Sequence, residues 1–205
     1  MTDAEPSLGL SILRDHLIEG SIEEGSYSIF SPDVIMGHDV TAPPAAELLN
    51  KAGLPYLRAN DRTYLYLDHF TPPKDRKSAE SCRSLREFSG RYGIGELVDW
   101  GEGICHVHLF EESRVLPGQL VIGADSHITT GGAIGALCIG IGSTDLAVAM
   151  ASGEFWLEVP RPKGVVFQGT PDVWCEAKDI ALRMISWIGP GGSKGEVMEM
   201  DGEII

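Results

Sequence analysis

The sequence predicts a three-layer α/β fold with a parallel sheet over residues 1–160, followed by the beginning of a second, smaller α/β domain over residues 161–205. Two observations favour this class. Short apolar strand patterns alternate with amphipathic helix patterns, and two of the strands end in polar residues. Ligands of α/β proteins usually bind at the carboxyl ends of parallel strands. The functional site is therefore expected at that edge of the sheet.

The helices are predicted from apolar residues that recur every three or four positions. The first covers residues 7–17, where Ser7 can cap the N-terminus and four leucines follow at near-helical spacing. A longer helix over residues 78–92 carries charges on one face and apolar side chains on the other. Further helices are predicted over residues 45–52, 146–152 and 177–188.

The strands that matter for function are predicted over residues 63–67 and 119–123. The first is rich in β-forming residues and runs directly into Asp68 and His69. The second is followed by Ala124-Asp125-Ser126-His127. If both strands belong to one parallel sheet, the two polar tips lie at the same edge. Strands over residues 164–168 and 196–200 are predicted for the second domain.

The boundary between the domains is predicted at Pro160-Arg161-Pro162-Lys163, since proline breaks regular elements. A glycine-rich turn over residues 189–195 is expected to precede the last strand. The glycines between residues 131 and 142 do not have the spacing of a dinucleotide-binding fingerprint. We expect them to allow close packing instead.

Composition excludes several functional classes. The chain has 205 residues with 30 Asp and Glu against 16 Lys and Arg, a formal charge of −14, which repels nucleic acids and anionic membranes. The four cysteines have no paired spacing and are expected to be reduced thiols. The first 20 residues contain four carboxylates and no unbroken apolar run. We expect a cytoplasmic protein without a membrane span.

Three histidines have neighbours that suit acid–base chemistry: His69 follows Asp68, His106 follows Gly103-Ile104-Cys105, and His127 lies two residues after Asp125. A carboxylate that accepts an imidazole N–H fixes the tautomer and raises the basicity of the ring. Together the three histidines predict an acid–base pocket. Taken singly, each is better explained as a structural histidine that caps a loop or pairs for structure.

A metal site is the alternative for two of these histidines. His106 and His108 lie two residues apart, as on one face of a strand, and with His127 they could bind zinc. No fourth ligand stands out, and His108 is as easily a solvated residue beside two glutamates.

The ordered series of motifs resembles the aconitase superfamily, and especially the large subunits of 3-isopropylmalate dehydratase and homoaconitase. The motifs are Val34-Ile35-Met36-Gly37-His38-Asp39-Val40-Thr41-Ala42-Pro43, Leu67-Asp68-His69, Gly103-Ile104-Cys105-His106, Leu116-Pro117-Gly118, Gly123-Ala124-Asp125-Ser126-His127 and Gly140-Ile141-Gly142-Ser143-Thr144-Asp145. The resemblance covers nearly the whole chain.

The resemblance implies reversible dehydration of a hydroxy di- or tricarboxylate with a [4Fe–4S] cluster as Lewis acid. It implies that Asp68 with His69, and His106 with Asp125, form hydrogen-bonded acid–base pairs. Ser126, His38 and Asp39 would contact the substrate. His127 and Glu199 would complete the catalytic network.

The chain departs from the family pattern at Val107 and Ile128, where glutamine and threonine are common. It also ends before the family's three cluster cysteines, its arginine clamp and its catalytic serine. By itself the chain is expected to hold no metal or cluster.

Three hypotheses follow. In a split enzyme, partner chains supply the cysteines, the arginines and the base; these partners would be the cysteine-bearing remainder of the large subunit and a small swivelling subunit. In a cluster-free enzyme, the same residues act on a different substrate, and Val107 and Ile128 make the pocket more apolar. The third is a non-catalytic binding module or a fragment of a longer subunit. The complete set of charged pairs favours the split enzyme.

Overall fold

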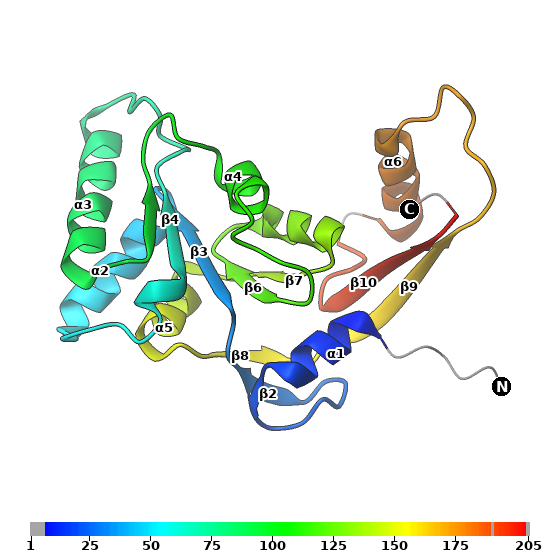
Figure 1. The fold of residues 1–205 in the computed structure, drawn as a ribbon, viewed down its shortest axis with the longest axis horizontal. Coiled ribbons are helices and arrows are strands. Elements are labelled where there is room, and N and C mark those ends of the chain that lie inside the picture. The colour runs from blue at the N-terminus through cyan, green and yellow to red at the C-terminus, as the bar shows by residue number, and fades with distance from the viewer. Residues whose placement is uncertain (1–6, 190, 204–205) are drawn as a thin grey trace.

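The computed structural model describes residues 7–189 and 191–203 (Figure 1). Residues 1–6, at the start of the first predicted domain, lie outside the described residues. So do residues 190 and 204–205 of the second predicted domain. The helices are α1 (Leu8–Asp15), α2 (Ala42–Ala52), α3 (Arg76–Tyr92), α4 (Cys105–Glu111), α5 (Ser143–Ser152) and α6 (Ala177–Ile188), with 3₁₀ helices η1 (Asn60–Arg62) and η2 (Ser126–Ile134). The strands are β1 (Leu17–Glu19), β2 (Tyr27–Phe30), β3 (Val34–His38), β4 (Thr63–Tyr66), β5 (Glu96–Val98), β6 (Leu120–Gly123), β7 (Leu137–Gly140), β8 (Phe155–Glu158), β9 (Arg161–Phe167) and β10 (Glu196–Gly202).

The predicted parallel sheet is confirmed. Five strands lie in the order β5-β4-β3-β6-β7, and every neighbouring pair is parallel. All five residues of β3 are buried, as expected for the central strand of a sheet covered on both faces. The strands next to β3 are β4 and β6, which are the two strands that carry the polar tips.

Helices cover both faces of this sheet, which confirms the three layers. Side chains of β3 alternate between two cores: Ile35 belongs to one, while Val34 and Met36 belong to the other. The first core contains buried residues of α2, α3 and α5, and the second contains buried residues of α4 and η2 (Figure 1). The site edge therefore lies between two helical layers.

The sequence-based helices agree with the structure except at their ends. Ser7 caps α1 as predicted, since its hydroxyl accepts a hydrogen bond from Leu10 N at 3.1 Å. The helix predicted from residue 45 begins three residues earlier, because Pro43 and Pro44 are tolerated in a first turn. The helix predicted from residue 78 begins at residue 76, where Asp75 caps it.

A second sheet was not predicted. Strands β1, β2 and β8 form an antiparallel sheet in that order, and β2 pairs with β8 along its full length. Phe30 of β2 and Leu13 of α1 are fully buried in the first core. This sheet thus closes one end of the parallel-sheet core.

The prediction that residues 160–163 break any element is wrong. Arg161, Pro162 and Lys163 lie within β9, which pairs in parallel with β10 and places Pro162 opposite Val197. Proline is tolerated because β9 is an edge strand, where a missing N–H leaves no ladder bond unmade. Helix α6 connects the two strands, as predicted. No helix among the described residues is long and apolar enough to cross a membrane.

The close packing expected for the glycines after β6 is found at Gly131. A Cβ on Gly131 would come within 2.7 Å of the Phe110 ring and closer still to Cys138. The contact joins η2 to α4 and β7, so Gly131 limits how closely these elements approach, whereas a Cβ on Gly132 would meet nothing within 4 Å.

Candidate active site

The two polar tips lie at the same edge of the sheet, on either side of β3. Strand β3 ends at His38, and the backbone N–H of Asp39 donates to Tyr66 O of β4 at 2.9 Å. On the other side, Ala124 N donates to Met36 O at 2.9 Å. These bonds extend the ladder beyond the strand ends. They fix the positions of the residues that follow β3, β4 and β6.

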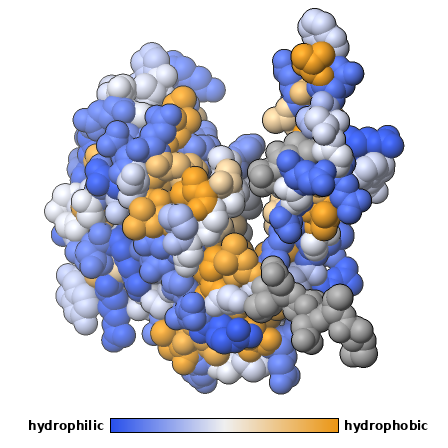
Figure 2. Space-filling model, turned by 45° about the vertical axis from the view of Figure 1, so that its right-hand side comes forward, coloured by the Kyte–Doolittle hydropathy of each residue, from blue (hydrophilic) through white to orange (hydrophobic). Residues whose placement is uncertain are grey.

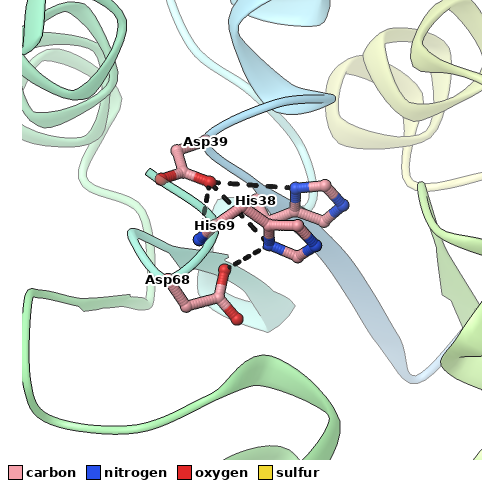
Figure 3. A group of neighbouring side chains, drawn as sticks. All are labelled: His38, Asp39, Asp68 and His69. Carbon is pink, nitrogen blue, oxygen red and sulfur yellow. Dashed lines mark hydrogen bonds and ion pairs between the residues drawn. The ribbon is translucent and has the colours of Figure 1, made fainter. Parts of the chain in front are cut away.

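Seven side chains gather there, and we call them the histidine–aspartate cluster. They are His38, Asp39, Asp68, His69, His106, Asp125 and His127. Figure 3 shows four of them, with the rings of His38 and His69 lying one over the other. The two ring centroids are 3.8 Å apart and the rings are nearly parallel.

Asp68 and His69 form the hydrogen-bonded pair that the sequence predicts. His69 Nδ1 is 2.7 Å from Asp68 Oδ1, and the other carboxylate oxygen accepts the backbone N–H of Cys105 at 2.7 Å. Burial alone would raise the pKa of Asp68, but the bonds from Cys105 and His69 outweigh it and lower this pKa below its usual range. Asp68 is therefore held as an anion that orients His69.

Asp125 is surrounded by three histidines. Its Oδ2 lies 3.2 Å from His38 Nε2, and its Oδ1 lies 3.1 Å from His106 Nε2 and 3.0 Å from His127 Nδ1. Burial would raise the pKa of Asp125, but the His127 backbone N–H and the three imidazoles lower it overall. His106 therefore lies beside Asp125 as predicted, but the predicted hydrogen bond between them is not formed, since neither ring nitrogen of His106 has a hydrogen-bond partner among the described residues. His38 in addition links Asp125 to the Asp68–His69 pair.

The two most enclosed histidines of the cluster, His38 and His106, are held neutral. Burial lowers the pKa of His38, and the neighbouring His69 adds to the effect. Burial also lowers the pKa of His106, against the attraction of Asp125. Neutral imidazoles beside ionised carboxylates can accept or relay protons near neutral pH.

The predicted substrate residues differ in their access to solvent. Ser126 is exposed at the start of η2, and the His127 side chain is 77% exposed. His38 and Asp39 are buried, and both oxygens of Asp39 accept backbone N–H groups, from His69 at 3.2 Å and Phe70 at 2.8 Å. Asp39 thus positions the residues that follow β4, a role that the sequence pattern alone did not indicate.

Glu199 makes its hydrogen bonds outside the histidine–aspartate cluster. Its Oε1 accepts from Ser7 Oγ at 2.5 Å and from Gly9 N at 2.9 Å, at the N-terminus of α1. Among the described residues it makes no hydrogen bond with His127 or another member of the cluster. Its place in the catalytic network stays a prediction from the resemblance.

The zinc set of His106, His108 and His127 is not brought together. The strand expected for residues 106–108 is wrong, because these residues lie in helix α4. Residues two apart on a helix point in different directions, and His108 Nδ1 lies 3.3 Å from the Tyr66 hydroxyl.

The cysteines do not fit an iron–sulfur cluster, whose irons are normally bound by thiolates. Cys82, Cys105 and Cys138 are buried, and Cys175 is exposed. Burial raises the pKa of Cys138 to about 12 and, with the help of Asp68, also raises that of Cys105. In the described part of the chain, the groups of three or more ligand atoms within 4.8 Å of one another contain no cysteine.

A groove of about 350 Å³ lies beside β7 and β8. It is lined by the ends of β7 and β8 and the start of α5, including Gly142, Trp156 and Glu158. None of the predicted site residues lines it. The chemistry of the cluster, rather than the size of this groove, identifies the candidate site.

The comparisons with known proteins bear on this arrangement. The model of the aconitase family (aconitate hydratase) matches residues 10–205. The chain belongs to the aconitase family. Among curated members of this family, the chain is 44% identical to the 3-isopropylmalate dehydratase large subunit of Aquifex aeolicus (strain VF5), over 95% of the chain and 45% of that protein. It is 43% identical to large subunit 1 of Pyrococcus furiosus, over 95% of the chain and 46% of the relative.

The 3-isopropylmalate dehydratase large subunit of Caldicellulosiruptor saccharolyticus is 42% identical, over 96% of the chain and 46% of the relative. The chain thus spans about half the length of the aconitase-family relatives it matches. The cluster lies within the matched part.

Proposed function

We propose that this chain supplies the acid–base and substrate-contacting residues of an aconitase-type hydro-lyase, which removes water from and adds water to a hydroxy di- or tricarboxylate. The observation that carries the proposal is the convergence of the Asp68–His69 pair and the three histidines of Asp125 at one sheet edge. The relatives at 42–44% identity are named as dehydratase large subunits, which supports the reaction class.

Dehydration needs a proton for the departing hydroxyl group and a base for the proton on carbon. The Nδ1 of His69 faces Asp68, so Nε2 is left for the substrate, and the side chain is 36% exposed. We assign His69 Nε2 as the donor to the departing hydroxyl, which leaves as water. The Asp68 anion stabilises the proton on the ring before transfer. In hydration the same nitrogen takes a proton from water.

The Asp125 side of the cluster would bind the substrate. His127 and Ser126 are exposed at the start of η2 and can contact a substrate carboxylate. Neutral His106 completes this side, while buried His38 and Asp39 hold the two tips in register. We assign no step to Glu199, whose carboxylate binds the N-terminus of α1.

Partner segments are part of the proposal. The ion pairs of Asp39, Asp68 and Asp125 all involve histidines, so the described cluster has no Lys or Arg to neutralise a di- or tricarboxylate. We propose that the cysteine-bearing remainder of the large subunit supplies the [4Fe–4S] ligands. A small swivelling subunit would bring the arginines and the base that takes the carbon-bound proton.

An enzyme that works without an iron–sulfur cluster is the second candidate. It is favoured by Val107, which is 45% exposed on α4 next to His106 and adds apolar surface there. Ile128 gives no such support, because it is fully buried beneath β6 in the second core and cannot line a pocket.

The test begins with the native mass of the protein purified without oxygen from its own host. The split hydro-lyase predicts a heteromer that carries iron and turns over a hydroxy di- or tricarboxylate. A homo-oligomer without iron that acts on no such acid would contradict it, and iron-free turnover would favour the second candidate.

Variants of the active complex then test the residue assignment. Asp68→Asn and His69→Gln should each lower kcat by about 10²- to 10⁴-fold, the usual contribution of a general acid. His108→Gln, on α4 but outside the cluster, should retain activity. Unchanged kcat in both cluster variants would show that another group protonates the hydroxyl.

A further inference from the structure

We propose that His106, Asp125 and His127 form a binding site for one divalent transition-metal ion. The three residues come from the start of α4 and the start of η2, at the carboxyl edge of the sheet. Each offers one ligand atom, and the three atoms lie within 4.8 Å of one another. The inference concerns metal binding by this chain and does not depend on the proposed hydro-lyase reaction.

The distances suit a shared ion. Metal–nitrogen and metal–oxygen bonds of such ions are about 2.0–2.2 Å long, so two ligands at right angles are about 3 Å apart. Asp125 Oδ1 lies 3.1 Å from His106 Nε2 and 3.0 Å from His127 Nδ1. Without an ion this oxygen forms hydrogen bonds with His127 Nδ1 and with His127 N at 2.6 Å, and a bound ion would take the place of the proton between Nδ1 and the oxygen. Two imidazoles and one carboxylate are a known ligand set for divalent iron and related ions.

Of the three residues, His106 gives the strongest indication of a bound ion. Both of its ring nitrogens are buried and have no hydrogen-bond partner among the described residues. Its Nε2 is close to Asp125 Oδ1, yet it is not aimed at that oxygen as a hydrogen bond requires. Ligands of one metal ion have this relation, because each lone pair points at the ion rather than at the neighbouring ligand. A bound ion would remove the cost of an unpaired buried nitrogen.

The surroundings favour a cation and orient its carboxylate ligand. The second oxygen of Asp125 is 3.2 Å from His38 Nε2, an outer contact of the kind that fixes metal-binding carboxylates. No Lys or Arg pairs with Asp125 in the described structure. His127 is 77% exposed, so an ion can enter from solvent and keep water or another oxygen donor at its open positions.

The neighbouring group of His38, Asp39, Asp68 and His69 is a weaker candidate because, unlike His106, it contains no buried ring nitrogen without a hydrogen-bond partner. Both oxygens of Asp39 accept backbone N–H groups, and His69 Nδ1 is paired with Asp68. His38 Nδ1 accepts from Val40 N at 3.3 Å, and its Nε2 is near Asp125. The stacked rings also leave no space for an ion between them.

The experiment is a titration of the tag-free, chelator-treated chain with Co²⁺, followed by its visible d–d absorption, and with Zn²⁺ by calorimetry. We expect one ion per chain. His127→Gln should weaken binding by about 100-fold or more, since it removes a ligand. Because His127 is exposed, this variant should keep the fold, which far-ultraviolet circular dichroism verifies. Asp125→Asn should have the same effect on affinity.

Two control variants separate this site from other ligands. His108→Gln and Cys175→Ser should bind Co²⁺ like the unaltered chain, since His108 contacts Tyr66 and Cys175 lies far along the sequence. Absence of Co²⁺ binding would overturn the proposal. Equal affinity in folded His127→Gln, or loss only in a control variant, would also overturn it.

Discussion

Asp39 is a buried anchor for the tip of β4. It is fully enclosed, and its carboxylate accepts the N–H groups of His69 and Phe70, while its backbone carbonyl accepts the Ser81 hydroxyl at 3.1 Å. Through its side chain and its carbonyl group, this one residue therefore joins the ends of β3 and β4 to α3. A carboxylate suits this place because it is an acceptor on both oxygens.

Asp39→Asn should lower the free energy of unfolding by about 1–3 kcal/mol, because the amide NH₂ would face a backbone donor and leave it unpaired. Urea unfolding measures the change. Asp15→Asn is the control, since Asp15 is exposed at the end of α1 and should stay within about 0.5 kcal/mol of the original. Equal stability of the two variants would show that the Asp39 bonds carry no net stabilisation.

The pKa values of His38 and His106 predict a loss of stability in mild acid. Burial lowers both pKa values below 6.5, so the unfolded chain binds more protons than the folded chain as the pH falls below that value. The free energy of unfolding should then decrease as the pH falls. A second decrease is expected below about pH 3.8, where Asp68 and Asp125, with lowered pKa values, become protonated on unfolding.

Urea unfolding at a series of pH values tests this dependence. In His38→Gln the slope of the first decrease should become smaller, because one of the two titrating groups is gone. A stability that does not change between about pH 7 and 5 would contradict the assignment of buried, neutral histidines.

At the scale of elements, the approach of α2 and α5 to β3 depends on Gly37. A Cβ at this position would meet Leu146 at 2.9 Å and Ala42 at 3.1 Å, one from each helix. The residue precedes His38, so packing at Gly37 also sets the position of the histidine that bridges the two tips.

Gly37→Ala should destabilise the fold by about 1–3 kcal/mol through overpacking. Gly90→Ala is the matched control, because Gly90 is exposed inside α3 and a Cβ there meets nothing within 4 Å. This control should stabilise the protein by about 0.5–1 kcal/mol. Thermal unfolding of the two variants should therefore shift in opposite directions, and a shift of both in one direction would contradict the packing argument.

The same scale shows which elements could be predicted from sequence. Strands β4 and β6 have apolar runs that stop abruptly at polar residues, so their tips and shared edge were predictable. Helix α4 was not, because Ile104 to Leu109 alternates like a strand, while Cys105 and Leu109 are buried at the i, i+4 spacing of a helix. The seven residues of α4 fit both the period of a strand and the period of a helix. Contacts with η2 and β4 favour the helix.

Strands β1, β2 and β8 were missed for a different reason. They are about as short as β4 and β6, but each includes exposed positions instead of a mostly buried apolar run that stops at polar residues. Their pairing joins residues 27–30 to residues 155–158, and local sequence carries no signal of that contact. In the cluster, likewise, the bridge from His38 to Asp125 spans 87 residues and depends on strand order alone.

At the scale of the whole molecule, the β9–α6–β10 part stands beside the main body, and Figure 2 shows it at the right with a furrow between the two. Only Met184 of α6 is buried, and Leu182, Ile185 and Trp187 are more than half exposed. We propose that residues 1–160 and 161–205 are separate folding units, of which the second buries little apolar surface by itself.

Limited digestion with chymotrypsin tests that division. The first cut should follow Trp174, which is 86% exposed in the segment between β9 and α6. Mass spectrometry should detect fragments of residues 1–174 and 175–205. Trp174→Ser should remove the early cut. Of the other exposed aromatic residues, Tyr27 and Trp156 lie in paired strands and Trp187 lies in α6, while Tyr56 and Trp100 lie in loops but are less exposed than Trp174. An early cut within residues 1–160 would contradict the proposed units.

The central position of β3 has a consequence for binding. A small molecule or ion held between the tips of β4 and β6 acts as a non-covalent cross-link across three neighbouring strands, because β3 lies between them. Amide protons of β3 exchange with solvent only when one of its two neighbours detaches. Occupancy of the site should therefore slow exchange most strongly at residues 34–38, all of which are buried.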